Sequence, residues 1–348
     1  MTDDSPGQPL GSPPDPLDPL DHSSHDDEHH RDPSGEAVTE AGLAHLHPGV
    51  RQIALADDAV RLQAIRAKRW ITHPPAARVL ASLREALDQT PSDRMENLLL
   101  VAESGMGKTM LLRKFHRERA QAFDPVAGLQ PHPVVLTLMP EDPSDEAFFV
   151  QVLKAVGAPV DLPRRLHRLS LRKTTFRILR ELGTRMLMID EINSILVGSA
   201  RQQRQFLQLL RFLSNELQVA IVCAGVPEAR FALLSDPQLR SRVADVTLEP
   251  RTAGSELQAF VTMLVQSLPL RQPSPVDSVK LRRLLIERSG GITLSICRAV
   301  ERAGIAAIRS GRERIELSGL DDPEIWRGLS PPEGVGRLRP AALVHGQP

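Results

Sequence analysis

The chain has 348 residues, of which 41% are apolar and 25% are charged, the balance of a globular protein with a substantial core. It contains nine Phe, two Trp and no Tyr, which argues against modules that bind nucleic acid by stacking bases on aromatic side chains. The N-terminus is acidic and Pro-rich, unlike a signal peptide, and no apolar run reaches the ~18 residues of a membrane helix. We therefore expect a cytoplasmic protein, with Cys223 and Cys297 as reduced thiols.

The net charge of zero conceals an uneven distribution. Residues 1–36 carry ten acidic side chains and one basic side chain, whereas the remainder carries 42 basic and 33 acidic side chains. A basic body favours a polyanionic partner, and the acidic segment is either a competitor for that surface or a solubilising tail.

The first 95 residues divide into two predicted segments. Residues 1–36 are rich in Pro, Asp, Ser and His, and they hold too few large apolar residues to form a core, so we expect disorder. Residues 37–95 show apolar side chains at helical spacing, for example Val79, Leu83 and Leu87. We expect a helical segment here that leads into the first strand.

Strand and helix patterns alternate over residues 96–250. A continuous apolar run predicts a buried parallel strand at 97–102, and further strands are predicted at 133–139, 185–190, 219–224 and 243–248. Helical periodicity predicts helices over 108–122, 144–156 and 200–217. This order predicts an α/β domain with a five-stranded parallel sheet.

After Pro250 the strand patterns stop. Helical patterns over 255–268, 275–288 and 293–309 predict a small helical lid domain spanning residues 251–318. Residues 319–348 are rich in Pro and Gly, and we expect a flexible tail.

A phosphate-binding loop follows the first predicted strand directly, at Ala102–Thr109 (AESGMGKT). Gly105 and Gly107 let the backbone curl so that N–H groups point at phosphates, Lys108 reaches the β- and γ-phosphates, and Thr109 ligates Mg²⁺. The helix that follows places its N-terminus at the anion. We expect ATP and Mg²⁺ as cofactors. The predicted nucleotide-binding residues are Glu103, Ser104, Gly105, Met106, Gly107, Lys108, Thr109 and Met110.

Two carboxylates end the third predicted strand, in the sequence MLMIDE. Asp190 at the strand tip is predicted to hold Mg²⁺, with Thr109 as the other protein ligand. Glu191 is predicted to polarise the attacking water as general base. Together with the phosphate-binding loop about 80 residues upstream, the pair favours ATP hydrolysis over binding alone.

An arginine cluster, QLRSR at residues 238–242, precedes the fifth predicted strand. An Arg at this place can neutralise charge on the γ-phosphate of a neighbouring subunit. We predict Arg242 in this catalytic role, with Arg240 as the reserve and an exposed structural charge as the alternative.

The order of these motifs, with a helical lid after them, resembles the AAA+ ATPases. Within that superfamily the chain resembles the TniB family, the ATP-dependent subunits of mercury-resistance-type transposons. The segments that carry the resemblance are RWI at 69–71, residues 97–115, residues 188–217 (MIDEINSILVGSARQQRQFLQLLRFLSNEL), AGVPEA at 224–229, DPQLRSRV at 236–243 and SGGITLS at 289–295.

The resemblance implies an ATP-dependent DNA transposition protein. Such a protein oligomerises as a ring or filament on double-stranded DNA of arbitrary sequence, and it recruits or regulates a DDE-type transposase. Two alternatives stay open: a nucleotide-dependent assembly switch with little hydrolysis, and an ATPase that resembles a DNA-replication loader.

The sequence departs from the family pattern at three places. Ala102 replaces the first Gly of the loop, and Val226 replaces a small polar residue that senses the γ-phosphate. Thr293 and Leu294 occupy the place where many AAA+ lids carry an Arg, and Arg298 one turn later is either a substitute or a surface charge. These departures predict slow hydrolysis.

Two further features have open interpretations. A basic segment lies between the second and third strands, and it either faces DNA phosphates or forms a solvated helix face. Its residues are Arg164, Arg165, His167, Arg168, Arg172, Lys173 and Arg177. Arg69 and Trp70 either lie near the adenine or anchor the N-terminal helical segment.

Overall fold

The computed structural model describes residues 40–158 and 168–329, with side chains from residue 171 onward in the second range. The described residues form two compact units. The first combines residues up to Ile71 with Leu257–Leu284 and Cys297–Leu329, and the second combines Thr72–Glu256 with Leu285–Ile296. The domain boundaries that we inferred from the sequence remain a prediction.

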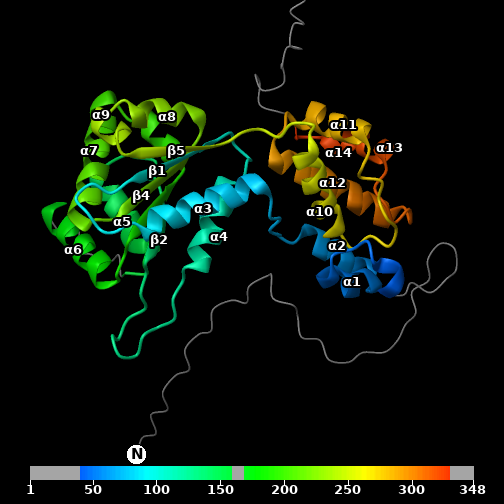
Figure 1. Cartoon of the computed structure of the whole chain (residues 1–348), viewed down its shortest axis with the longest axis horizontal. Helices are drawn as coiled ribbons and strands as arrows, with labels where there is room; N and C mark the ends of the chain where they lie inside the picture. Colours follow the sequence, from blue (N-terminus) through cyan, green and yellow to red (C-terminus); the bar gives the residue numbers. More distant parts are fainter. Residues whose placement is uncertain (1–39, 159–167, 330–348) are drawn as a thin grey trace, which may run out of the picture. The chain divides into compact units, whose positions relative to one another are not determined.

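The larger unit is built on a sheet of five parallel strands (Figure 1). The strands are β1 (Asn97–Ala102), β2 (Val134–Leu138), β3 (Met186–Asp190), β4 (Ala220–Gly225) and β5 (Val243–Leu248). Their order across the sheet is β2-β3-β4-β1-β5, and every neighbouring pair is parallel. The predicted five-stranded parallel sheet is thus confirmed.

The register brings the ends of the central strands together. Val101 in β1 lies opposite Gly225 in β4, and Leu138 in β2 lies opposite Asp190 in β3. The segments that follow β1, β3 and β4 therefore leave the sheet at one edge, where ligands of open parallel sheets bind.

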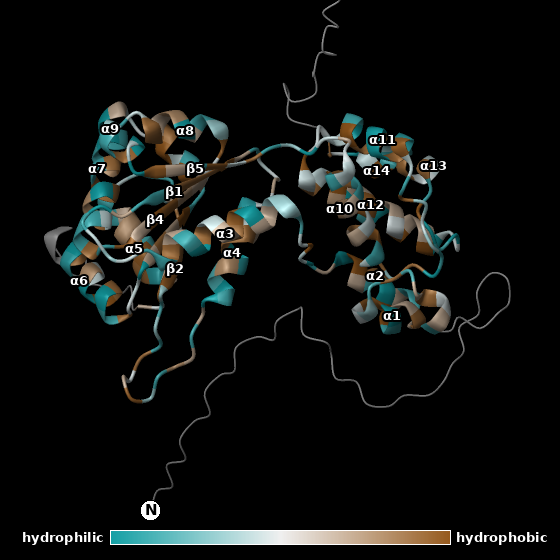
Figure 2. Cartoon of the chain, in the orientation of Figure 1, coloured by the Kyte–Doolittle hydropathy of each residue, from teal (hydrophilic) through white to brown (hydrophobic). Residues whose placement is uncertain are grey.

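Helices cover both faces of the sheet. Helices α3 (Pro74–Asp88) and α4 (Lys108–Glu118) contact one face, while α5 (Asp145–Ala155), α6 (Arg168–Glu181) and α7 (Ala200–Leu217) form the layer on the other. The strands between these layers are brown in Figure 2, the colour of hydrophobic residues. Burial on both faces explains why β1, β3 and β4 are so rich in apolar residues.

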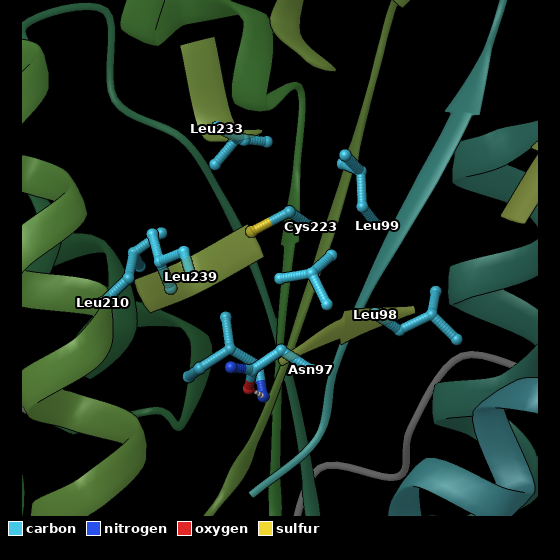
Figure 3. A pocket seen from close by; sticks show the side chains of 9 residues that line it. Asn97, Leu98, Leu99, Leu210, Cys223, Leu233 and Leu239 are labelled. Carbon is cyan, nitrogen blue, oxygen red and sulfur yellow. Dashed lines mark hydrogen bonds between the residues drawn. The ribbon is translucent and has the colours of Figure 1, made fainter. Parts of the chain in front are cut away.

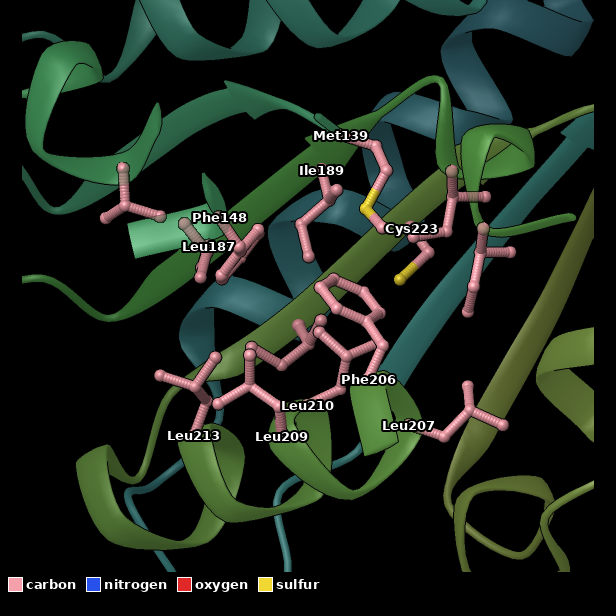
Figure 4. Close-up of a cluster of buried hydrophobic side chains, with 14 of the residues drawn as sticks. Met139, Phe148, Leu187, Ile189, Phe206, Leu207, Leu209, Leu210, Leu213 and Cys223 are labelled. Atoms are coloured by element: carbon pink, nitrogen blue, oxygen red, sulfur yellow. The ribbon is translucent and has the colours of Figure 1, made fainter. Parts of the chain in front are cut away.

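The core under α7 packs around aromatic side chains. Phe206 of α7 meets Phe148 of α5 edge to face, with ring centroids 5.2 Å apart, and both side chains are fully buried (Figure 4). Leu187, Ile189 and Cys223 join the same cluster from β3 and β4. Burial raises the pKa of the Cys223 thiol to about 12, so this thiol is inert.

A small cavity lies beside this core, between the sheet and the helices that follow β4 (Figure 3). Its walls include Leu99, Cys223, Leu233 of α8 (Pro227–Leu234) and Leu239 of α9 (Pro237–Arg240). Asn97 borders it, with Oδ1 accepting the Ile221 N–H at 2.8 Å. The cavity is lined mainly by apolar side chains and offers no chemistry of its own.

The smaller unit is helical. Its elements are the 3-10 helix η1 (Glu40–Leu43), α1 (Pro48–Leu55), α2 (Asp58–Arg66), α13 (Leu317–Leu320), α14 (Pro323–Trp326), and most of α10 (Ser255–Gln266), α11 (Val279–Ser289) and α12 (Thr293–Arg309). The fully buried Arg61 of α2 joins distant segments: its guanidinium binds Glu313 and donates to Pro269 O at 2.9 Å. This ion pair fastens α2 to the C-terminal segment of the unit.

The structure extends and corrects the elements predicted from the sequence. Helix α4 ends at Glu118, before the predicted end at residue 122, and the described part of the basic segment belongs to α6. The flexible tail predicted from residue 319 is wrong for residues 319–329, because α14 forms there and Trp326 is buried. The predicted disorder of residues 1–36 lies outside the described residues. In the described ranges, no helix is both long enough and apolar enough to cross a membrane.

Candidate nucleotide-binding site

The phosphate-binding loop takes the expected conformation between β1 and α4. Gly105 and Gly107 have φ values of +79° and +99°, in the left-handed region that glycine enters at little cost. Gly107 precedes the first turn of α4, which has no side-chain cap. The free N–H groups at this helix start therefore point toward the loop, where an anion can accept their hydrogen bonds.

Lys108 is held inside the loop. Its Nζ donates to Ala102 O at 2.7 Å and to Glu103 O at 3.1 Å, and the side chain is buried. Burial lowers the pKa of the Lys108 ammonium, and three nearby carboxylates oppose that shift, those of Glu191, Asp190 and Glu103. The predicted lysine and the predicted acidic pair thus lie close enough to interact electrostatically.

The acidic pair combines one buried and one exposed carboxylate. Asp190 is only 1% exposed, and its Oδ1 accepts the Glu191 N–H at 3.0 Å. Glu191 is exposed and has φ +56°, a left-handed conformation that is uncommon for a residue with a Cβ. This turn separates the two side chains, so that one stays at the strand tip and the other faces solvent.

The end of β4 packs tightly against the segment after Glu191. A Cβ on Gly225 would lie 2.6 Å from Ile192 Cγ2 and 3.5 Å from Asn193 N, so only glycine fits without a shift. Val226 follows as the residue before α8 and makes no side-chain cap. Asn193 Oδ1 is buried and accepts no hydrogen bond from any described residue, a polar atom that sequence reasoning did not single out.

Residues 292–294 also contact the phosphate-binding loop. The Leu294 N–H donates to Gly105 O at 2.9 Å, and Ile292 Cγ2 would be 2.9 Å from a Cβ on Gly105. Thr293 Oγ1 lies 3.9 Å from Met106 Sδ. This segment of the predicted lid therefore contacts the phosphate-binding loop directly, although no cation stands at positions 293 and 294.

The other residues predicted to bind the nucleotide differ in their exposure to solvent. Met106 is buried, Thr109 is half-buried at the start of α4, and Ser104 and Met110 are exposed. In the described ranges, no group of three or more His, Cys, Asp or Glu side chains converges on a point. Thr109 and Asp190 could thus bind a cation only together with phosphate oxygens or water.

The arginine cluster lies at the opposite edge of the sheet. Arg242 precedes β5, and its carbonyl accepts the N–H of Asn97 at the beginning of β1. The length of β1 separates this edge from the loop by roughly 17 Å. Arg242 Nη1 donates to Asn215 Oδ1 at 2.9 Å, whereas Arg240 is exposed and its side chain has no partner within the described part of the chain. Neither arginine reaches the loop of its own chain.

The basic helix α6 presents part of the predicted basic segment. Arg172, Lys173 and Arg177 line a hollow between α6 and α7 together with Phe212 and the carboxylates of Glu181 and Glu216. The Arg172 guanidinium lies 4.9 Å from the Phe212 ring centre. Arg164, Arg165 and His167 lie outside the described residues, as does the side chain of Arg168. The described part fits both interpretations, because a solvated helix face and a phosphate-binding face expose the same cations.

Arg69 anchors the N-terminal helical segment. Its Nη2 donates to Ala64 O at 2.9 Å and also to Ile65 O, at the end of α2. Its Nη1 contacts Ser267 after α10. These contacts favour the anchoring role over a place beside the adenine.

The sequence profile of the bacterial TniB protein family matches residues 61–252. The chain belongs to the TniB family. That match covers the whole sheet, the phosphate-binding loop, the acidic pair and the arginine cluster. A comparison with curated protein sequences gave no match.

Several solved structures share the fold of this TniB protein. The ORC2 protein of Aeropyrum pernix, in ADPNP and ADP complexes, is 16% identical with a TM-score of 0.53, over 76% of this chain and 71% of its own. ORC1 of the same organism, in complex with DNA, is 18% identical with a TM-score of 0.53, over 77% and 68%. Cdc6p from Pyrobaculum aerophilum is 16% identical with a TM-score of 0.51, over 75% and 68%. This TniB protein has the AAA+ P-loop fold.

Proposed function

We propose that this protein is an ATP-dependent DNA transposition protein, which assembles on target DNA and recruits or regulates a DDE-type transposase. The observation that carries the proposal is the convergence at one edge of the sheet. The phosphate-binding loop, the buried Lys108 and the carboxylates of Asp190 and Glu191 meet there, in a chain of the TniB family.

The proposed chemistry is slow ATP hydrolysis. Lys108 exchanges its backbone acceptors for β- and γ-phosphate oxygens, and the N–H groups at the start of α4 bind the same anion. Thr109 and Asp190 would hold Mg²⁺, which neutralises phosphate charge when bound. The exposed Glu191 orients a water for attack on the γ-phosphorus. Val226 supplies no polar group beside this water, which favours slow turnover.

The site is proposed to be completed by a second copy of the chain. An arginine at the edge opposite the loop can act only on the nucleotide of a neighbour, because its own loop is roughly 17 Å away. Arg242 is hydrogen-bonded to Asn215 within its chain, whereas Arg240 is exposed. The sequence alone favoured Arg242 for this role. Because of these contacts, we assign the role to Arg240 instead.

The hollow between α6 and α7 is the proposed contact with the DNA backbone. Arg172, Lys173 and Arg177 provide three cations on one helix, and the ORC1 protein of Aeropyrum pernix, which has the same fold, was solved in complex with DNA. Binding to phosphates is independent of sequence and weakens with salt, by about 0.9 in the logarithmic slope for each phosphate neutralised.

A nucleotide-dependent assembly switch is the second candidate function. Val226 favours it, because the position at the end of β4 lacks a side chain that can hydrogen-bond the γ-phosphate. Such a switch binds ATP and assembles without appreciable turnover, and it differs from the first proposal only in the rate of ATP hydrolysis.

The test is binding to a labelled DNA duplex of arbitrary sequence, measured by fluorescence anisotropy with no nucleotide, with ADP and with ATP. We expect tight binding with ATP only, and its loss in Lys108→Ala. Combined Ala substitutions at Arg172, Lys173 and Arg177 should weaken binding and reduce the salt slope by up to about 3.

A matched control removes three exposed cations elsewhere, by Ala substitutions at Lys280, Arg283 and Arg312. Equal loss in both triple variants would contradict the assignment of the α6 hollow. Equal DNA binding with and without ATP would contradict ATP-dependent assembly. Co-sedimentation of the assembled complex with a purified DDE transposase then tests recruitment, and absence of the transposase from the ATP-dependent pellet would refute it.

A further inference from the structure

Arg251 lies where the polypeptide leaves the sheet, shortly after β5 ends at Leu248. Its N–H donates to Gly291 O at 2.9 Å, which ties it to the segment that contacts the phosphate-binding loop. A Cβ on Gly291 would clash with Arg251 O, and Gly291 has φ +80°. Glycine at 291 is therefore required for this close approach.

The Arg251 side chain turns toward the loop. Its Nε donates to Thr293 Oγ1 at 3.1 Å, and that hydroxyl lies 3.9 Å from Met106 Sδ. The next N–H, that of Leu294, donates to Gly105 O. Only the Thr293 side chain thus separates Arg251 from the loop. Thr293 occupies one of the two positions where many AAA+ lids carry an arginine.

A third element lies within electrostatic reach of Arg251. His73 forms the N-cap of α3, with Nδ1 accepting the Ala76 N–H at 3.3 Å. Its pKa is lowered to about 4, first by burial and then by the positive charges of Arg251 and Arg78. Arg251 therefore carries its charge at a point where α3, the segment 291–294 and the phosphate-binding loop approach one another.

The other candidate for a lid cation is Arg298, one turn after Leu294 on α12. Its side chain is exposed, and its positive charge acts on the carboxyl of Glu301, whose pKa burial raises. Arg251 makes the described contact with Thr293, whose hydroxyl lies 3.9 Å from Met106 Sδ of the loop, so it is the better placed of the two cations.

We propose that Arg251 is the cation that binds the phosphate chain of the nucleotide from the lid side, in place of an arginine at positions 293 or 294. Thr293 is its positioning residue, because the hydroxyl fixes the guanidinium near Met106. This inference rests on the proposed nucleotide site and adds to it a ligand that lies far from Lys108 in the sequence.

The test measures the affinity of the full chain for fluorescent ATP and ADP analogues by direct titration. Arg251→Gln keeps a polar side chain and the backbone contacts with Gly291 while removing the charge. We expect its nucleotide affinity to fall by roughly 10- to 100-fold, the range of a charge-assisted hydrogen bond. Thr293→Val, which keeps the side-chain volume, should give a smaller loss of about 2- to 10-fold.

Arg298→Gln is the matched control, since it removes an exposed arginine from the helix that begins at Thr293, and it should bind both nucleotides like the wild type. Melting temperatures without nucleotide verify folding of each variant. Wild-type affinity in Arg251→Gln, with binding lost in Lys108→Ala, would overturn this inference and leave the proposed function standing. A larger loss in Arg298→Gln than in Arg251→Gln would also overturn it. Absence of binding by the wild type would overturn both proposals.

Discussion

Protonation of His73 should destabilise the protein between pH 6.5 and pH 4. The folded chain keeps this imidazole neutral down to about pH 4, because burial and the charges of Arg251 and Arg78 oppose protonation, whereas the ordinary pKa of His is 6.5. Between these values the unfolded state binds more protons than the folded state. The free energy of unfolding therefore falls as the pH is lowered through this window, and the contribution of His73 is fully present above it.

The size of the effect follows from the pKa shift. Each pKa unit corresponds to about 1.4 kcal/mol, so the full shift would amount to about 3 kcal/mol. His73 is only half-buried, and solvent screening reduces the expected loss to roughly 1–2 kcal/mol. For a unit of this size, that lowers the melting temperature by roughly 2–8 °C.

The assay is thermal unfolding by calorimetry at several pH values between 4 and 7, with wild type beside His73→Asn. Asn retains an N-cap acceptor for α3 and does not titrate, so the variant should lose less stability on acidification. His47→Asn, the same exchange at the exposed N-cap of α1, controls for other acid effects. Identical pH dependence of wild type and His73→Asn would refute the reasoning.

Three further substitutions test the geometry of the site. Gly225→Ala places a methyl group 2.6 Å from the buried Ile192, and we expect a loss of about 1–3 kcal/mol in urea unfolding; an unchanged midpoint would contradict the tight packing. Val226→Thr adds a hydroxyl at nearly constant volume and should raise phosphate release several-fold, an expectation that an unchanged rate would refute. Arg240→Ala should lower turnover by at least about 10-fold while ATP still binds, and the same loss in Arg242→Ala alone would reverse our assignment.

The sheet and the loop could be predicted from the sequence because their signals are local. Apolar runs such as the one ending at Ala102 identify buried parallel strands, and the glycines with Lys108 identify the phosphate-binding turn. The order of the strands, with β4 between β1 and β3, came from the structure. That order decides which motifs share an edge, and local patterns do not contain it.

Other features depend on contacts between distant residues. Composition indicated a loose C-terminal tail, yet Trp326 is buried and its Nε1 donates to Leu320 O at 2.6 Å, a contact that the Pro and Gly content of the tail does not reveal. The link from Arg251 to Thr293 spans 42 residues and leaves no periodic signal. Arg240 and Arg242 are both arginines and lie two positions apart, so the sequence alone does not show which of them is free to act on a neighbouring subunit. Their contacts in the structure distinguish them.

Steady-state phosphate release in the presence of duplex DNA tests the central claim most directly, with wild type compared to Glu191→Gln. The substitution removes the charge that orients the attacking water and keeps the side-chain shape, so ATP binding should persist. We predict slow release by the wild type, and a rate at background in Glu191→Gln. Equal background rates for the two proteins would contradict the claim that this TniB protein hydrolyses ATP, and would leave the assembly switch as its function.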